Sequence, residues 1–276
     1  MEDDPPKRLA RSATGTPLLG ADDGFVPLAS ARPGTGMEDA LAHAADGSLP
    51  DPRDGTAAPV AADAISFGPP LRRPGKIWCI GLNFRDHADD LDEDRPDAPG
   101  SFMKPATALT GPGGPIRRPP TDLAGRVTGE AELALVIGRT CRNVPVDAVD
   151  RVVAGWMPVI DVTAEDVFQK NTRFLTRSKS FDTFFVLGPW IETALPVGGL
   201  GDVEIRTIVD GRVRAANTID AMAFSPAELV AYHSRVMTLE PGDLLSTGTP
   251  GAHPIEPGAK VRAEVDRVGA VEATVV

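Results

Sequence analysis

The stretch EAELALVIG, from Glu130 to Gly138, decides the fold expected for this chain, because it combines a continuous apolar run with two acids one residue apart. Residues i and i+2 of a strand point to the same face, about 6.5 to 7 Å apart along the chain. A strand this apolar should be buried, where two like charges raise each other's pKa or destabilise the fold. We therefore expect a positive group, such as a bound cation, beside Glu130 and Glu132.

A third acid and a lysine extend this pattern. Asp161, in WMPVIDVTAED, ends the apolar segment Val152–Ile160, and Lys179 follows in RSKSFDTFF. Three carboxylates without Cys or His neighbours in sequence indicate a hard, oxygen-liking metal site; Mg is expected first, with Mn or Ca as alternatives. The alternative from the residues alone is that the Glu-x-Glu pair marks a solvent-facing strand edge.

Composition limits the class of protein. A chain of 276 residues with 42% hydrophobic content can form one large domain, or a large and a small one. The formal charge of -11 argues against nucleic acid as a partner, because such binding relies on cationic groups that neutralise phosphates. The two cysteines, Cys79 and Cys141, favour a reduced compartment without a disulfide framework.

No targeting or membrane segment is expected. The first residues, MEDDPPKRLARS, lack the cationic start and apolar stretch of a secretory signal. No apolar run approaches the ~20 residues of a membrane span. We therefore expect a cytoplasmic protein with no membrane partner.

The chain divides near residue 70. Residues 7–30 show short apolar strands broken by TGTP and ADDG, which favour hairpins, and a brief helix is expected in MEDALAHAADG. The stretch 50–74 is rich in Pro, Ala and Asp and resembles a linker. We predict a small N-terminal domain with its linker over 1–70 and a larger domain over 71–276.

The second part is mainly β. Strands are predicted in KIWCIGL, EAELALVIG, VEIRTIVDG and AKVRAEVD, separated by long loops. Two helices are expected, one in VPVDAVDRVVAG and one in SPAELVAYHSRVMT, where Ser225 caps, Pro226 takes the first position and Glu228 completes a capping box. The predicted class is α+β, a mainly β core with helices at its edge.

With these segments placed, the chain resembles the fumarylacetoacetate hydrolase family over essentially its whole length. The matching stretches are RPGKIWCIGLNFRDHA, FMKPATALTGPGGPI, EAELALVIG, KSFDTFFVLGPW, LVAYHSRVMTLEPGDLLSTGTPG and GAKVRAEVDRVGAVEATVV. The resemblance implies a mixed β-sandwich roll around a metal site, a small N-terminal domain and a homodimer. It also implies an enzyme that acts on small 2-oxo or 1,3-dicarbonyl acids.

The resemblance assigns roles to individual residues. It places the metal ligands at Glu130, Glu132 and Asp161, and a catalytic lysine at Lys179. A catalytic His with an acid three residues later corresponds to His87 and Asp90 in HADD, one helical turn apart. The Gly-Thr-Pro loop that approaches the ligand falls on 248–250 and includes Thr249.

The substrate side departs from the family pattern. The arginine and glutamine that typically hold a substrate carboxylate or its polar edge correspond here to Glu165 and Phe168. Gln169 lies one position late. We predict a specialised substrate, bulkier and less anionic than the usual one, with Arg85 and Lys104 as candidates to replace the missing arginine.

These residues permit several reactions. Our first hypothesis is hydrolysis of a C–C bond through a metal-stabilised enolate, with His87 as general base oriented by Asp90 and Lys179 as a second positive group. The same scaffold also suits decarboxylation, tautomerisation or other isomerisation, or dehydration. A binding protein that has lost the reaction is the alternative from a different class. Lys179 in a structural pair with Glu165 or Asp182, and Thr249 as a turn former, are the corresponding structural alternatives.

Overall fold

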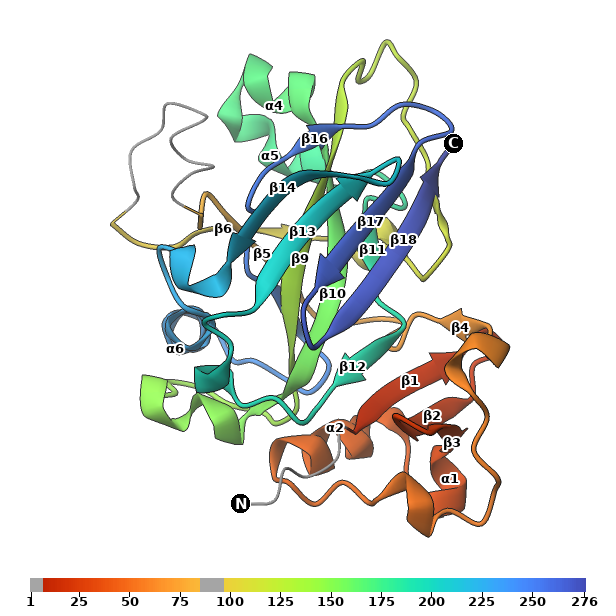
Figure 1. Cartoon of the computed structure of the whole chain (residues 1–276). Helices are drawn as coiled ribbons and strands as arrows, with labels where there is room; N and C mark the ends of the chain where they lie inside the picture. Colours follow the sequence, from red (N-terminus) through yellow and green to blue (C-terminus); the bar gives the residue numbers. More distant parts are fainter. Residues whose placement is uncertain (1–6, 85–96) are drawn as a thin grey trace.

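The computed structural model describes residues 7–84 and 97–276. Two β-sheets form most of it (Figure 1). The larger sheet has the strand order β3 (Gly24–Pro27), β2 (Pro17–Ala21), β1 (Arg8–Ser12), β12 (Trp190–Glu192), β10 (Val153–Ala164), β9 (Val127–Ile137), β15 (Leu244–Ser246), β5 (Ile77–Gly81) and β6 (Gly100–Lys104). The smaller sheet has the order β14 (Arg212–Thr218), β13 (Glu204–Val209), β17 (Lys260–Val265), β18 (Gly269–Val275) and β8 (Pro115–Ile116).

Short strands and helices complete the fold. The short strands β4 (Phe67–Gly68), β7 (Leu109–Thr110), β11 (Phe185–Leu187) and β16 (His253–Pro254) pair along the larger sheet. Within the described ranges the α-helices are α1 (Leu28–Ala31), α2 (Met37–Ala45), α4 (Glu165–Lys170), α5 (Leu175–Lys179) and α6 (Pro226–Val236). The 3-10 turns are η1 (Pro52–Asp54), η2 (Ala62–Ala64), η3 (Ala106–Ala108), η4 (Val146–Arg151), η5 (Thr172–Phe174), η6 (Val197–Gly199) and η7 (Ile219–Ala221). The predicted α+β class, a mainly β sandwich roll, is confirmed.

Strands β9 and β10 form the centre of the molecule. They pair antiparallel over their full lengths, and every residue in both is buried. Figure 1 shows β13 and β17 in front of them, α4 and α5 at their upper end, and β1 to β3 at their lower end. A strand covered on both sides needs apolar residues on both faces, which explains the continuous apolar run in the sequence.

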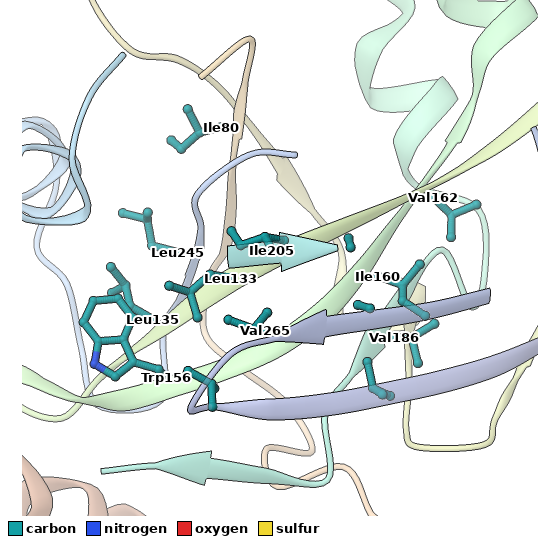
Figure 2. Close-up of a cluster of buried hydrophobic side chains, with 14 of the residues drawn as sticks. Ile80, Leu133, Leu135, Trp156, Ile160, Val162, Val186, Ile205, Leu245 and Val265 are labelled. Carbon is teal, nitrogen blue, oxygen red and sulfur yellow. The ribbon is translucent and has the colours of Figure 1, made fainter. Parts of the chain in front are cut away.

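The two faces of β9 contact different cores. Ala131, Leu133, Leu135 and Ile137 pack against the smaller sheet, where Ile205 and Val265 belong to the same cluster (Figure 2). Ala134 and Val136 face the other way and pack in a second cluster with Leu41 of α2. By strand alternation, Glu130 and Glu132 lie on this second face, away from the smaller sheet.

The N-terminal strands join the larger sheet. Strand β1 pairs antiparallel with β12, so β1 to β3 extend the sheet that contains β9 and β10. The predicted hairpins and the short helix α2 are present. A separate domain over 1–70 remains a prediction.

One predicted helix is wrong. The stretch 144–155 was expected to be helical, but it contains the six-residue 3-10 turn η4 and then enters β10 at Val153. Val153 pairs with Ile137 of β9, and Gly138 donates a backbone hydrogen bond to the Val152 carbonyl at 2.8 Å. Strand pairing therefore takes the backbone groups that a longer helix would need.

The second predicted helix is confirmed. Helix α6 starts at Pro226, and its capping box is complete, because Ser225 Oγ accepts from the Glu228 N–H while the Glu228 side chain accepts from the Ser225 N–H. None of the helices in the described ranges is long and apolar enough to cross a membrane.

Candidate metal centre

Three buried carboxylates converge on the face of β9 and β10 that points away from the smaller sheet. One oxygen from each of Glu130, Glu132 and Asp161 lies within 4.8 Å of the other two. Asp161 is directly opposite Glu130 in the strand ladder, and Glu132 is two residues further along β9. The alternation expected from the sequence therefore does bring the two glutamates together with Asp161.

Two lysines lie against these carboxylates. Lys179, at the end of α5, donates from Nζ to Glu130 Oε2 and Asp161 Oδ2, both at 2.9 Å. Lys104, at the end of β6, forms an ion pair with the other Asp161 oxygen. Three carboxylates and two ammonium groups leave one negative charge unbalanced in a buried site, which is unfavourable without a further cation or a proton.

The pKa values reflect this imbalance. Burial and the nearby Asp161 charge raise the pKa of Glu132 to about 8, so its carboxyl group takes the extra proton when no cation is present. Burial alone would lower the pKa of Lys179, but the charges of Asp161, Glu130 and Glu132 together raise it. Lys179 therefore remains an ammonium group at neutral pH.

Neighbouring donors orient the carboxylates. Ser246 Oγ and the Gly248 N–H donate to Glu132 Oε2 at 2.5 and 3.0 Å. Thr163 Oγ1 donates to Glu130 Oε1 at 2.5 Å. Hydrogen bonds of this kind hold the carboxylate groups in one orientation, in which their free oxygen lone pairs could coordinate a metal ion.

Gly248 is required where it stands. Its φ is +96°, and a Cβ at this position would lie 3.0 Å from the Asn83 Cβ. The left-handed conformation and the close approach both favour glycine. They direct the Gly248 N–H to Glu132, and Asn83 fixes the same loop by donating from Nδ2 to the Thr247 carbonyl at 2.8 Å.

The donor set fits a hard divalent cation. All three candidate ligands are carboxylate oxygens of residues in the paired strands β9 and β10. The centre carries one uncompensated negative charge, and a hard divalent cation would compensate it. Lys179 also stacks over the ring of Phe102 at 5.0 Å, which holds the ammonium beside the centre. The acidic triad therefore supports a divalent-metal site.

Several expected substrate residues make other contacts. The Lys104 ammonium donates to the carbonyls of Val162, Lys179 and Phe184 at 3.1, 2.6 and 2.8 Å. This geometry favours a role in holding Asp161 rather than the expected contact with a substrate carboxylate. Thr249 Oγ1 donates to the Gly251 carbonyl and accepts from its N–H, as a turn-forming residue does.

The residues of α4 that depart from the family pattern also make contacts within the protein. Glu165 pairs with Arg126, not with Lys179, and its other oxygen accepts from Gln169 Nε2 at 3.1 Å. Phe168 is half-buried and Gln169 is exposed. The remaining predicted residues, Arg85, His87 and Asp90, lie outside the described residues.

Sequence reasoning missed three supporting residues, namely Ser246, Thr163 and Arg126. Thr163 lies two residues after Asp161, so strand alternation alone could have placed it beside the triad. Ser246 and Arg126 become visible only when the strand pairing is known.

The comparisons with known proteins agree with this fold. Residues 76–276 match the family described as Fumarylacetoacetate (FAA) hydrolase C-terminal. The chain belongs to the fumarylacetoacetate hydrolase family, whose relatives include hydrolases, isomerases and a tautomerase.

Three similar proteins illustrate this range. "Protein Rv2993c" of Mycobacterium tuberculosis is 38% identical over 84% of this chain and 92% of its own length. The mitochondrial oxaloacetate tautomerase fahd2 of Xenopus laevis is 36% identical over 77% of this chain and 69% of its own. A crystal structure of maleylpyruvate hydrolase from Sphingobium sp., in complex with manganese and pyruvate, is 29% identical with a TM-score of 0.78 and covers 98% of both chains.

Proposed function

We propose that this protein is a divalent-metal-dependent hydrolase that cleaves a C–C bond in a 2-oxo or 1,3-dicarbonyl acid. The observation that carries the proposal is the convergence of the Glu130, Glu132 and Asp161 carboxylates beside the Lys179 ammonium. The manganese and pyruvate held by the similar maleylpyruvate hydrolase are in keeping with this chemistry.

The cation would be held by the three carboxylates, with Mg as the first candidate because hard oxygen donors suit it, and Mn as the alternative. When bound, it would polarise a substrate carbonyl and stabilise negative charge that develops on the carbonyl oxygen.

The protein's own residues supply orientation and charge. Ser246 and the Gly248 N–H fix Glu132, while Thr163 fixes Glu130, so the ligand oxygens are preorganised. Lys179 provides a permanent positive charge beside the position of the reacting carbonyl, where it would favour a transition state with enolate character. His87, oriented by Asp90, is proposed as the general base that takes a proton from water.

A tautomerase, or another isomerase or decarboxylase, is the second candidate. The similarity to an oxaloacetate tautomerase favours it. Such a reaction uses the same positive centre and a proton shuttle but adds no water. The two candidate reactions therefore differ in whether an oxygen atom from water enters the product.

The test is a reaction survey in ¹⁸O-labelled water with Mg²⁺ or Mn²⁺, using acylpyruvates and oxaloacetate. Cleavage with uptake of ¹⁸O into the carboxylic acid product supports hydrolysis, whereas faster keto–enol interconversion or released carbon dioxide, without cleavage by water, supports the second candidate. Glu132→Gln should abolish turnover, because the site loses a ligand. A protein that binds the metal but converts none of these acids would favour a binding role instead.

A further inference from the structure

One edge of strand β9 has a gap beside the candidate metal centre. Along that edge β15 pairs with residues 134–136, and β16 pairs with residues 128–129. Among the described strands, none pairs with residues 130–132 on this side, while β10 pairs with them on the other. The chain between β15 and β16 leaves the sheet as the loop 247–252, and its Gly248 N–H bonds to Glu132.

A threonine from the smaller sheet fills this gap. The Ala131 N–H, between the two glutamates of the centre, donates to Thr207 Oγ1 at 3.0 Å. Thr207 belongs to β13 and is fully buried. Its hydroxyl oxygen therefore takes the place of the strand carbonyl that a buried backbone N–H would otherwise need.

The same hydroxyl also contacts the loop. A hydroxyl can accept and donate at once, and Thr207 Oγ1 donates to the Gly251 carbonyl at 3.4 Å. That carbonyl also accepts from Thr249 Oγ1 at 3.1 Å. Asn83 holds the start of the loop at Thr247. Thr207 therefore holds the other end of the loop and ties it to the backbone of β9.

Thr207 is an exception on its strand face. The inward-facing residues of β13 are Ile205, Thr207 and Val209, and Ile205 belongs to the same core cluster as Leu133 (Figure 2). A valine has nearly the shape of threonine and would suit this apolar face better, because a buried hydroxyl is unfavourable unless it is hydrogen-bonded. The two hydrogen bonds therefore account for a hydroxyl at this position.

An irregularity in the smaller sheet lies at the same place. In the ladder of β13 and β14, Thr207 pairs with Ala215, and the register shifts between Thr207 and Ile208, as at a β-bulge. Bulges re-aim side chains locally and are frequent beside functional sites. A Cβ on Gly251 would lie 2.8 Å from the Ala215 Cβ. The end of the loop therefore packs closely on the smaller sheet where Thr207 contacts it.

We propose that Thr207 is a positioning residue for the candidate metal centre. Through one hydroxyl it fixes both the β9 backbone between Glu130 and Glu132 and the loop that orients Glu132, and it does so from the face of β9 opposite the carboxylates. This inference rests on the proposed function and adds a residue that acts on the metal site through the backbone. The smaller sheet thereby takes part in shaping the site.

The test compares Thr207→Val, which removes the hydroxyl, with Thr207→Ser, which keeps it. Titration with Mn²⁺, followed by electron paramagnetic resonance, gives both the affinity and the spectrum of the bound ion. Thr207→Val should weaken Mn²⁺ binding by about tenfold, as expected for a group that orients metal ligands. The spectrum of the bound ion should also change, because the ligand oxygens shift. Thr207→Ser should match the wild type in both measurements.

Thr193→Val is the matched control. It removes a hydroxyl that donates to the Lys7 carbonyl at 2.7 Å, directly after β12, and should leave the affinity and the spectrum unchanged. An equal effect of this control, or unchanged Mn²⁺ binding and spectrum in Thr207→Val, would overturn the inference, even if Thr207→Val were less stable.

Thr207→Ser decides the question if Thr207→Val does not fold. Wild-type Mn²⁺ binding in Thr207→Ser supports the inference, whereas weakened binding with the hydroxyl intact would overturn it. A wild-type protein that takes up no Mn²⁺ would instead refute the proposed function, and this inference with it.

Discussion

Lys104 and Asp161 form an ion pair whose side chains are both fully shielded from solvent. Burial lowers the pKa of Lys104, and the charge of Asp161 opposes that effect. The ammonium group also lies within hydrogen-bond distance of three backbone carbonyls, those of Val162, Lys179 and Phe184. Lys104 therefore fastens β6 to the end of β10 at the point where Asp161 joins the candidate centre.

Removing Lys104 should destabilise the protein strongly. Lys104→Met leaves Asp161 with one buried cation fewer and removes the ammonium donor from three backbone carbonyls, so we expect a loss of about 3–5 kcal/mol in the free energy of unfolding. Urea unfolding of protein treated with a chelator measures it. Lys260→Met is the control, since Lys260 is 66% exposed beside Glu272 and should change stability by less than about 0.5 kcal/mol. Equal losses in the two variants would contradict the argument.

Metal binding should release a proton at neutral pH. The pKa of Glu132 is raised to about 8 without a cation, so below that pH the carboxyl group must lose its proton before it can act as a ligand. Affinity for Mg²⁺ should rise by about tenfold per pH unit up to pH 8 and then level off. Calorimetry in two buffers with different ionisation enthalpies measures the number of protons released when the metal ion binds. Glu132→Gln should show no such release, and a wild type without it at pH 7 would contradict the assignment.

Ser246 should matter to the metal although it is not a ligand. Ser246→Ala removes the 2.5 Å hydrogen bond to Glu132 and should weaken Mn²⁺ binding by about 10- to 100-fold. Titration followed by electron paramagnetic resonance measures free Mn²⁺ directly. Ser234→Ala is the control, because Ser234 is equally buried but bonds to Ala231 and Val144 instead. Unchanged affinity in Ser246→Ala would show that Glu132 needs no such support.

The capping box of α6 should contribute to stability alone. Ser225→Ala removes the acceptor of the Glu228 N–H at the first turn, and we expect a loss of about 1 kcal/mol. Thermal unfolding measures the change. Metal affinity should stay the same, because no side chain of the triad contacts this cap.

The strand β9 and its two faces could be predicted because a continuous apolar run, and the alternation of side chains between the faces of a strand, are local properties. Glu130 and Glu132 interrupt an apolar run at i and i+2, and that spacing alone placed them on one face. The cap at Ser225 is equally local. The stretch 144–155 misled the prediction because its helix-like apolar spacing competes with pairing to Ile137, a residue that only the folded sheet brings near.

The supporting residues of the site depend on pairing between distant segments. Ser246 reaches Glu132 because β15 lies beside β9, and the sequence does not specify that neighbour. Arg126 and Glu165 meet because β9 and β10 share one register. Lys104 was interpreted as a substrate contact, since its burial against three carbonyls cannot be seen from motif position.

The shared register of β9 and β10 has a practical consequence for anyone who redesigns this protein. A slip of one residue in β9 would send Glu130 and Glu132 toward the smaller sheet and turn Leu133 out of its packed cluster. A protein with this shifted strand register would thus lose both its cation-binding site and its packed hydrophobic core. A simple uptake assay for Mn²⁺ would therefore report correct strand alignment across a whole library of variants.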